Sequence, residues 1–352
     1  MTQLTLALRL LLVAALSTVT IFGVATAQAI DITTYRGACD GSAAVALDRD
    51  RFAVADDDSN VLNVYRRGQE AAILELNLDQ FLEAPKKKKP GPDGKPVFKE
   101  ADIEGAARVG DRIYWIGSHG RDSDGNAEPG RSRLFATRIV SGPDGPRLEP
   151  IKPGAYTALR ENMFDDPKLK PLKLSEAFAS GEKNGPAPEA KNGFNIEGLA
   201  ATPEGGLLIG FRNPRPGKQA IVIPLNNPAD VVDAGKKPVF GNPRLLDFEG
   251  RGIRSIDWIN NVYVIVAGPY GKARESKIKP PFALFTWSGN EADVKPRMMK
   301  KVKLPDDFSP EAVFEIPGSS NMMLLSDDGT DKCKDADKSK KSFRALTIPV
   351  PK

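Results

Sequence analysis

Residues 102–117 read DIEGAARVGDRIYWIG, and residues 195–210 read NIEGLAATPEGGLLIG. In both segments a glutamate, Glu104 or Glu197, stands thirteen positions before the closing glycine. Each segment reads as a short strand, a turn that contains Gly or Asp, and a more hydrophobic strand, which is typical of an antiparallel hairpin. We interpret the two segments as copies of an internal repeat, and a repeat constrains the fold of the whole chain.

Three further segments follow the same pattern less closely. Arginine replaces the glutamate in the third copy, at Arg254, and glutamate returns in the fourth, at Glu311. Positions 197, 254 and 311 are evenly spaced along the chain. Most copies continue into a third strand, so each unit reads as an antiparallel sheet of three or four strands. The three segments are residues 252–268, residues 309–326 and, as the weakest copy, residues 42–56.

The repeat predicts an all-β fold, a β-propeller of about five blades. A single sheet of this size cannot bury both of its faces, whereas sheets arranged radially pack face to face and protect their edges. Residues 30–35 and 343–348 alternate like edge strands, and we expect them to pair in one blade and close the ring. A two-sheet sandwich is the alternative architecture.

Two inserts interrupt the regular spacing, at residues 82–100 and residues 141–194. The first is rich in Lys, Pro and Gly and reads as a loop. The second contains short helical stretches at residues 156–164 and 174–179, between proline-rich turns. This second insert is long enough to contain a degenerate sixth blade, so a count of six blades stays open.

The N-terminus has the pattern of a signal peptide in residues 1–27. Arg9 precedes an apolar run over residues 10–24, and residues 25–27 form a small-x-small cleavage site. The run is shorter than the roughly 20 apolar residues that a membrane span needs, so we expect no stable membrane anchor. The sequence therefore predicts a periplasmic or secreted protein, with residues 28–352 forming a single propeller domain.

The chain contains two cysteines, Cys39 and Cys333. An exported protein normally oxidises such a pair, and both residues lie near the strands that are expected to close the ring. We therefore predict a disulfide between them, which would stabilise the fold by on the order of 5 kcal/mol in the chain-entropy description. No CxxC pair is present to support a redox role.

The composition argues against several function classes. The formal net charge of +4 is small for 352 residues, and basic residues alternate with acidic ones, so we expect no nucleic-acid partner. The four lysines at 86–89 read as a solvated loop tip. A single histidine and two bonded cysteines cannot form an ordinary zinc site, and no GxSxG, HExxH or GxGxxG motif occurs.

The start of each inner strand of a propeller points toward the central channel, so we expect Glu104, Glu197, Arg254 and Glu311 to converge there. Carboxylates that lie so close together repel unless something compensates them. A calcium ion held by the three glutamates is one compensator, and Arg254 is another. In the alternative interpretation these residues pair with one another and hold the blades together.

We expect the same face to carry the loops that follow the second strands. Arg121, Arg212 and Arg254 would then bind a small anionic ligand, and His119 would act as a general base beside a metal-bound water. A lone loop histidine also occurs simply as a hydrogen-bonding residue. The loops are residues 56–58, 118–121, 212–213 and 326–328.

Five segments closely resemble a bacterial family known as domain of unknown function 3616. The resemblance covers nearly the whole mature chain, but the family implies no agreed activity. More distantly, the glutamate-bearing repeat resembles the esterase-like phytases and the gluconolactonase and paraoxonase group, which implies a calcium-dependent propeller hydrolase. This chain departs from those hydrolases by placing Arg254 where they have a metal ligand. The segments are residues 37–42, 55–60, 102–119, 194–214 and 250–255.

Two hypotheses for the function follow. The first is a calcium-assisted hydrolase of phosphoesters, esters or lactones, with a polar site at the channel mouth. The second is a non-catalytic binding or scaffold module with a periplasmic protein partner. The charge balance of the rim distinguishes them, because an excess of unpaired carboxylates favours a metal and catalysis, whereas paired ones favour binding or plain structure.

Overall fold

The strands form five four-stranded antiparallel sheets in the part of the chain that the structure describes. This computed structural model describes residues 31–351 except 88, 92, 93, 95, 273, 274, 330–336, 338 and 339, so the predicted signal peptide, residues 1–27, lies outside the described residues. Blade 1 is β2 (Ala43–Ala46), β3 (Arg51–Ala55), β4 (Val61–Arg66) and β5 (Leu74–Asn77); blade 2 is β6 (Ile103–Val109), β7 (Arg112–Gly117), β8 (Leu134–Val140) and β9 (Arg147–Pro150). Blade 3 is β10 (Asn195–Ala201), β11 (Leu207–Asn213), β12 (Ala220–Leu225) and β13 (Arg244–Leu246); blade 4 is β14 (Gly252–Ile259), β15 (Val262–Gly268), β16 (Ala283–Trp287) and β17 (Arg297–Met298). Blade 5 is β18 (Pro310–Glu315), β19 (Asn321–Ser326), β20 (Ser342–Pro349) and β1 (Asp31–Arg36).

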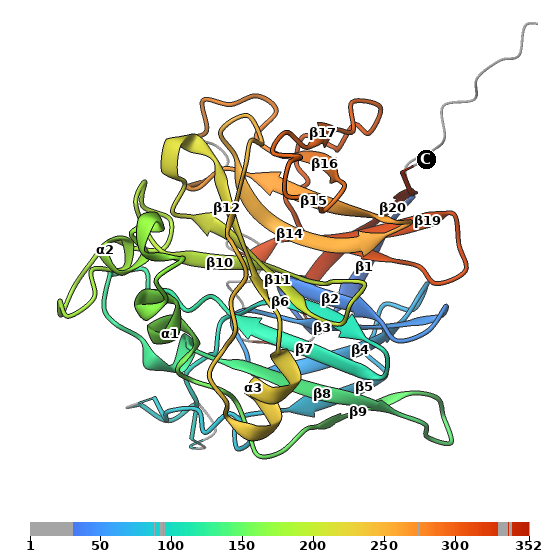
Figure 1. Cartoon of the computed structure of the whole chain (residues 1–352). Coiled ribbons are helices and arrows are strands. Elements are labelled where there is room, and N and C mark those ends of the chain that lie inside the picture. The colour runs from blue at the N-terminus through green and yellow to red at the C-terminus, as the bar shows by residue number, and fades with distance from the viewer. Residues whose placement is uncertain are drawn as a thin grey trace, which may run out of the picture. The chain divides into compact units, whose positions relative to one another are not determined.

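The five blades close into a ring (Figure 1). The first strands of neighbouring blades contact each other all the way round, from β2 through β6, β10, β14 and β18 and back to β2. β1 pairs with β20 over its whole length, from Asp31 opposite Thr347 to Arg36 opposite Ser342. Blade 5 is therefore built from both ends of the described chain. The prediction of a five-bladed propeller closed by its terminal strands is confirmed, in place of a sandwich or a sixth blade.

Alternate side chains of each strand fill the two interfaces of its blade. In β7, Ile113 and Trp115 pack in the cluster shared with blade 1, while Tyr114 and Ile116 pack in the cluster shared with blade 3. Both faces of the strand are buried, so it reads as a continuous apolar run instead of an alternating one. The described residues form five such clusters, one for each interface between blades.

Four of the five described first strands carry a one-residue bulge at the same place. The register between β6 and β7 shifts between Ile103 and Gly105, which leaves Glu104 without a partner in the ladder. A bulge re-aims the side chain of its extra residue. The repeat seen in the sequence is therefore a repeated bulge that presents one charged side chain in each of four blades. The residues left out in the other three strands are Glu197 in β10, Arg254 in β14 and Glu311 in β18.

The glycine that follows the bulge in β10 is required by the neighbouring blade. A Cβ on Gly198 would lie 2.8 Å from Cγ2 of Ile253 and 3.0 Å from Cγ2 of Ile256, both in β14. A Cβ on Gly105 in β6 would likewise lie 2.9 Å from Cβ of Leu199 in blade 3. In each Glu-Gly pair of the repeat, the glutamate is thus the bulged residue, and the glycine allows the neighbouring blade to approach closely.

The second predicted insert lies against the interface between blades 2 and 3. It begins with β9 and continues into α1 (Leu159–Asp165), η2 (Lys170–Leu172) and α2 (Leu174–Phe178), near the helical stretches expected at 156–164 and 174–179. Met163 and Phe178 pack into the cluster of that interface, together with Val231 of α3 (Pro228–Ala234). The remaining helices are η1 (Pro129–Arg131) and η3 (Pro216–Lys218). None of the described helices has the length and apolar character that a membrane span requires.

Cys39 is fully buried at the seam of the ring. The next residue, Asp40, forms an antiparallel bridge with Asp327 of blade 5, and the N–H of Gly41 donates to the carbonyl of Ser326 at 3.1 Å. Cys333 lies outside the described residues, so its disulfide with Cys39 stays a prediction.

Reduction of that disulfide is expected to lower the melting temperature of the mature protein, because the bond closes a loop of nearly the whole chain and restricts the unfolded state. The predicted loss is on the order of 5 kcal/mol or less. Peptide mass mapping without reduction, and thermal unfolding with and without reductant, test the bond and its effect. Two free thiols in the native protein would contradict it.

Replacing Gly198 with Ala is expected to reduce the free energy of unfolding by about 1–3 kcal/mol, because the added methyl group overpacks the contact with Ile253. Gly130→Ala is the matched control, since a Cβ there meets no described atom closer than 3.6 Å. Its effect should stay within about 0.5 kcal/mol. Urea unfolding measures both variants, and equal effects would argue against tight packing at the bulge.

Candidate functional site

One rim of the propeller holds the bulged charged residues. In an antiparallel hairpin the first strand starts where the second strand ends, so these residues share a rim with the ends of β3, β7, β11, β15 and β19. The structure divides this rim into two parts. The arginine side consists of Glu197, Arg212, Arg254 and Glu311, and the acidic side consists of Asp40, Asp56, Asp57, Asp102 and Glu104.

The arginine side is a closed network of buried ion pairs. Arg254 Nη1 lies 2.9 Å from Glu197 Oε2, and Arg254 Nη2 pairs with Glu311. Arg212 Nη1 lies 2.9 Å from Glu197 Oε1, which also accepts a hydrogen bond from Asn195 at 2.6 Å. Removing either partner of such a pair would leave a buried charge without compensation. The network therefore joins blades 3, 4 and 5, and two of the three glutamates predicted as calcium ligands, Glu197 and Glu311, are neutralised by Arg254.

The acidic side brings five carboxyl groups together from three segments of the chain. Asp40, Asp56 and Asp57 can place one oxygen each within 4.8 Å of one another, and so can Asp57, Asp102 and Glu104. Asp57 belongs to both groups and connects them. Of the predicted metal ligands, the structure places only Glu104 here.

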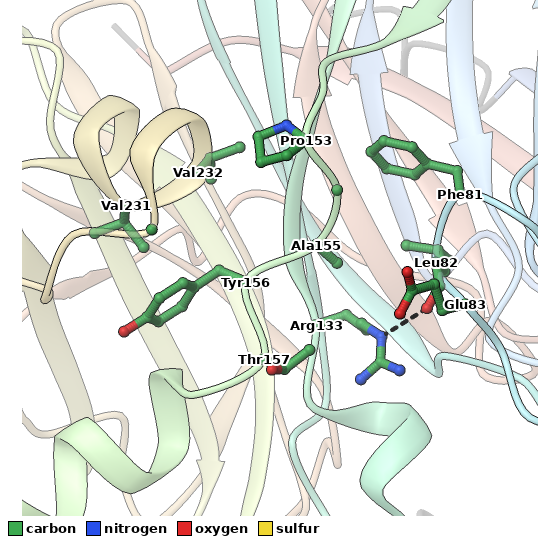
Figure 2. Close-up of a pocket in the computed structure, with 12 residues that line it drawn as sticks. Phe81, Leu82, Glu83, Arg133, Pro153, Ala155, Tyr156, Thr157, Val231 and Val232 are labelled. Atoms are coloured by element: carbon green, nitrogen blue, oxygen red, sulfur yellow. Dashed lines mark hydrogen bonds between the residues drawn. The ribbon is translucent and has the colours of Figure 1, made fainter.

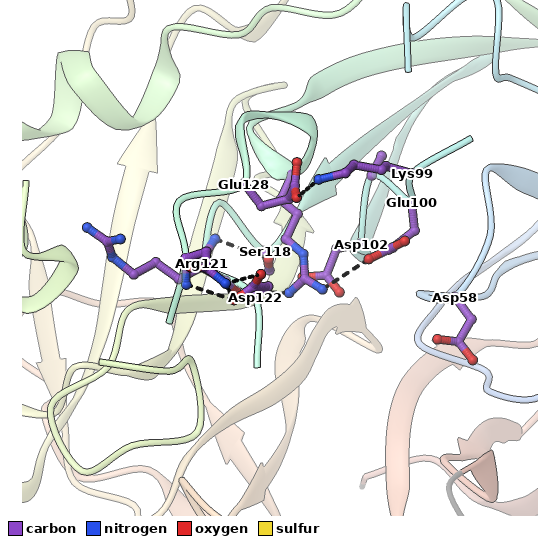
Figure 3. A network of polar contacts seen from close by, with 12 residues as sticks. Asp58, Lys99, Glu100, Asp102, Ser118, Arg121, Asp122 and Glu128 are labelled. Carbon is purple, nitrogen blue, oxygen red and sulfur yellow. Dashed lines mark hydrogen bonds and ion pairs between the residues drawn. The ribbon is translucent and has the colours of Figure 1, made fainter. Parts of the chain in front are cut away.

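Two of these carboxyl groups have strong partners. Asp56 accepts hydrogen bonds from the backbone N–H groups of Cys39 at 2.9 Å and Asp58 at 3.0 Å. Asp102 lies 2.9 Å from Nη1 of Arg131. Figure 3 shows Asp102 beside Ser118 and Glu100, with the Lys99–Glu128 ion pair close by and Asp58 on a separate loop.

The other three carboxyl groups form no ion pair among the described residues, and one oxygen of Asp40 and one of Asp57 are buried without a hydrogen-bond partner. Burial, followed by the charges of Asp57, Asp327 and Asp56, raises the pKa of Asp40 to about 11. Burial and neighbouring carboxylates also raise the pKa values of Asp57 and Glu104 well above their usual range. Without a cation, Asp40 therefore stays protonated at neutral pH, and burial favours the protonated forms of Asp57 and Glu104 in the same direction.

The donor set of the acidic side fits a calcium ion. Calcium binds six to eight oxygen ligands in a flexible geometry, and carboxylates are its usual protein ligands. An ion bound beside Asp57, Asp102 and Glu104 would supply a positive charge to Asp57 and Glu104, which form no ion pair among the described residues. The described groups contain no histidine or cysteine, so the site lacks the ligands that zinc prefers.

His119 does not belong to the acidic side. It is fully buried, its Nδ1 lies 2.9 Å from the carbonyl oxygen of Gly117, and its charged neighbours are Arg160 and Arg133. Burial lowers the pKa of His119 to about 3, so its imidazole is neutral at physiological pH. A group with so low a pKa is a weak general base.

Arg121 donates its side-chain hydrogen bonds to backbone carbonyl groups and not to the charged residues of the rim. Its five N–H donors bind five carbonyl oxygens at 2.7–3.1 Å, and its guanidinium lies over the ring of Phe178. No donor is left for a ligand. Its position ties the insert to the loop after β7. The carbonyl groups belong to Gly125, Phe178, Ala179, Glu182 and Lys183.

The structure adds Asp40, Asp102 and Arg131 to the residues that sequence reasoning singled out. Asp56–Asp58 were expected on this rim as a loop, but their approach to Asp102 and Glu104 depends on how blades 1 and 2 pack. In the sequence, the acidic residues of the site could be found from the position of each acidic run at the end of a strand. Arg131 has no such position, because it lies in η1, between β7 and β8.

The raised pKa values predict how stability depends on pH. Asp40 ionises near pH 4 in the unfolded chain but has a pKa of about 11 in the folded one, and the pKa values of Asp57 and Glu104 shift in the same direction, so the folded state binds more protons and loses stability as pH rises between these values. His119 adds no slope above its ordinary pKa of about 6.5, since it is then neutral in both states. The calcium-free protein should therefore melt at a lower temperature at pH 9 than at pH 6.5, and Glu104→Gln should flatten this dependence. Melting curves in chelator measure it, and a rising or flat profile for the unmodified protein would contradict buried, uncompensated carboxyls.

Comparison with solved structures finds chains that align with this one over most of their length but at low sequence identity. Glutaminyl cyclase from Myxococcus xanthus is 10% identical, with a TM-score of 0.43 and coverage of 92% of this chain and 96% of that chain. The PQQ-bound aldose sugar dehydrogenase from Streptomyces coelicolor is 11% identical, with a TM-score of 0.39 and coverage of 90% and 98%. The Cps50 (Swd1) β-propeller domain from Myceliophteria thermophila is 12% identical, with a TM-score of 0.38 and coverage of 91% and 100%. Likenesses at this level carry no conclusion about activity.

The sequence comparisons are more specific. No curated protein matches the chain. Residues 154–322 match the family described as "Protein of unknown function (DUF3616)", in agreement with the resemblance seen in the sequence. The matched segment includes blades 3 and 4, the three bulged strands β10, β14 and β18, and most of the insert. The chain thus contains a DUF3616 domain within a five-bladed β-propeller.

Proposed function

We propose that this protein binds a calcium ion on the acidic side of its channel mouth and, through the ion, a small anionic ligand. The observation that carries the proposal is the pair Asp57 and Glu104, which lie next to Asp102 without an ion-pair partner among the described residues. Burying a charge without a partner is costly, and a bound cation removes that cost.

The arrangement of the rim supports an anionic ligand at the ion. Calcium takes more ligands than three carboxyl groups supply unless some bind through both oxygens, so positions remain for water or a ligand. A carboxylate or phosphate oxygen is suited to such a position. Arg212 and Arg254 are already paired with Glu197, so the ion, rather than these arginines, would provide the free positive charge.

The predicted export is consistent with a calcium site. Calcium-binding modules outside the cytosol work with dissociation constants of about 10⁻⁴ to 10⁻³ M. The signal-peptide pattern of residues 1–27 supports a periplasmic or secreted location. We infer that the ion is bound after export and that the ligand is met in the same compartment.

Hydrolysis of a phosphoester, ester or lactone is the second candidate function, and Glu104 is the observation that favours it. A calcium ion polarises a carbonyl or phosphoryl oxygen, and a carboxyl group whose pKa is raised can exchange a proton with a water molecule. Glu104 is better placed for this than His119, because Glu104 belongs to the acidic side. A hydrolase would lose turnover in Glu104→Gln with p-nitrophenyl phosphate or δ-valerolactone as substrate.

Calcium titration of the chelator-treated mature protein tests the primary proposal. Calorimetry should give one ion per chain, with proton release that decreases as pH rises, because bound carboxyls must ionise. Asp57→Asn and Glu104→Gln should each weaken binding by at least about tenfold, since even residues outside the coordination sphere change metal affinity by 10–100-fold. Calcium should also raise the melting temperature of the unmodified protein.

Asp58→Asn is the matched control, because Asp58 is exposed and adjacent in sequence but belongs to neither carboxyl group. Its calcium affinity should change by less than about threefold, as expected for a screened surface charge. Absence of calcium binding, or equal losses in all three variants, would contradict the proposal. The non-catalytic scaffold with a periplasmic protein partner would then be the better explanation, with the arginine side as its structural centre.

A further inference from the structure

A cavity of about 210 Å³ lies away from the channel mouth, among blade 2, the insert and α3. Figure 2 shows Phe81, Leu82 and Glu83 along one side, Tyr156, Val231 and Val232 along the other, and Arg133 with Thr157 between them. The lining is therefore partly apolar and partly polar, and it includes one cationic side chain.

Arg133 is a buried cation without an ion-pair partner among the described residues. The residue is 9% exposed and lies directly before β8. Its Nε donates to the carbonyl of Leu82 at 3.1 Å, and its Nη1 donates to the carbonyls of Pro129 at 2.9 Å and Ser132 at 3.0 Å. These three bonds fix the guanidinium, and the two donors of Nη2 have no hydrogen bond to the part of the chain that the structure describes.

The electrostatics of the cavity favour an anion. Burial lowers the pKa of Arg133, and the one nearby charge that opposes this effect is Glu83. Glu83 lines the cavity but is exposed and forms no ion pair with Arg133 in the described structure. A buried guanidinium whose positive charge is not neutralised gains most from a ligand that supplies a carboxylate.

We propose that this cavity binds a small organic carboxylate, with the anionic group on Arg133 and the apolar part against Phe81, Pro153 and Val232. A dry cavity of about 150 Å³ in another protein accepts benzene, so this volume accepts a carboxylate about the size of benzoate. Thr157 lies beside the guanidinium and offers a hydroxyl group for a further hydrogen bond. The site is separate from the channel mouth and does not depend on calcium.

Calorimetric titration with benzoate, in chelator, tests the site. Benzamide has nearly the same shape and no charge, so it should bind at least about tenfold more weakly, as expected when a charge-assisted hydrogen bond is lost. Arg133→Gln should weaken benzoate binding by at least about tenfold for the same reason. Arg138→Gln, in β8 of the same blade but exposed, is the matched control and should leave the affinity unchanged.

Glu83→Gln provides a test that does not depend on the structural bonds of Arg133. Glu83 is exposed, so the variant should fold normally, and removing its negative charge should tighten benzoate binding by about two- to fivefold. Absence of benzoate binding, equal affinity for benzoate and benzamide, or an affinity that Glu83→Gln leaves unchanged would each overturn the proposal. Weaker binding in Arg138→Gln than in Arg133→Gln would do so as well.

Discussion

The bulge in the first strand of four blades is the feature on which the rest of the channel mouth depends. It places Glu104, Glu197, Arg254 and Glu311 at one rim, where the first strands of neighbouring blades are in contact and where three of these four side chains are buried and Glu104 is half-buried. Charges brought so close in a low-dielectric setting must be paired, neutralised by a proton, or held by an ion. Each half of the rim satisfies this requirement differently.

On the arginine side the requirement is met within the protein. Arg254 stands between Glu197 and Glu311, so one substitution in the repeat turns a potential ring of acids into an ion-paired brace across three blades. On the acidic side no described residue forms an ion pair with Asp57 or Glu104, although Arg131 pairs with Asp102. The rim therefore combines a structural half with a half that is suited to an external cation, which is why neither of the two hypotheses from the sequence describes it alone.

The same reasoning connects the two proposed sites. At the channel mouth, Asp57 and Glu104 form no ion pair with any described residue, and in the outer cavity the same is true of the guanidinium of Arg133. By contrast Arg121, which is also buried, is fully satisfied by five carbonyl groups and supports the fold. An arginine whose N–H donors all bind backbone carbonyl groups supports the fold, whereas an arginine that keeps unused donors can bind a ligand.

The sequence by itself determined the blade repeat and the closure of the ring, because strand periodicity and turn residues are local and recur in every unit, but it left the choice between five and six blades to the structure. It also placed the charged position of four units on a common rim. Only the tertiary structure decided which charges meet: that Arg254 lies between two glutamates, that Asp57 joins Asp102 and Glu104, and that His119 lies among arginines instead. These pairings depend on how adjacent blades pack and on which side chains lose water, and neither property is encoded in the spacing of residues within one blade.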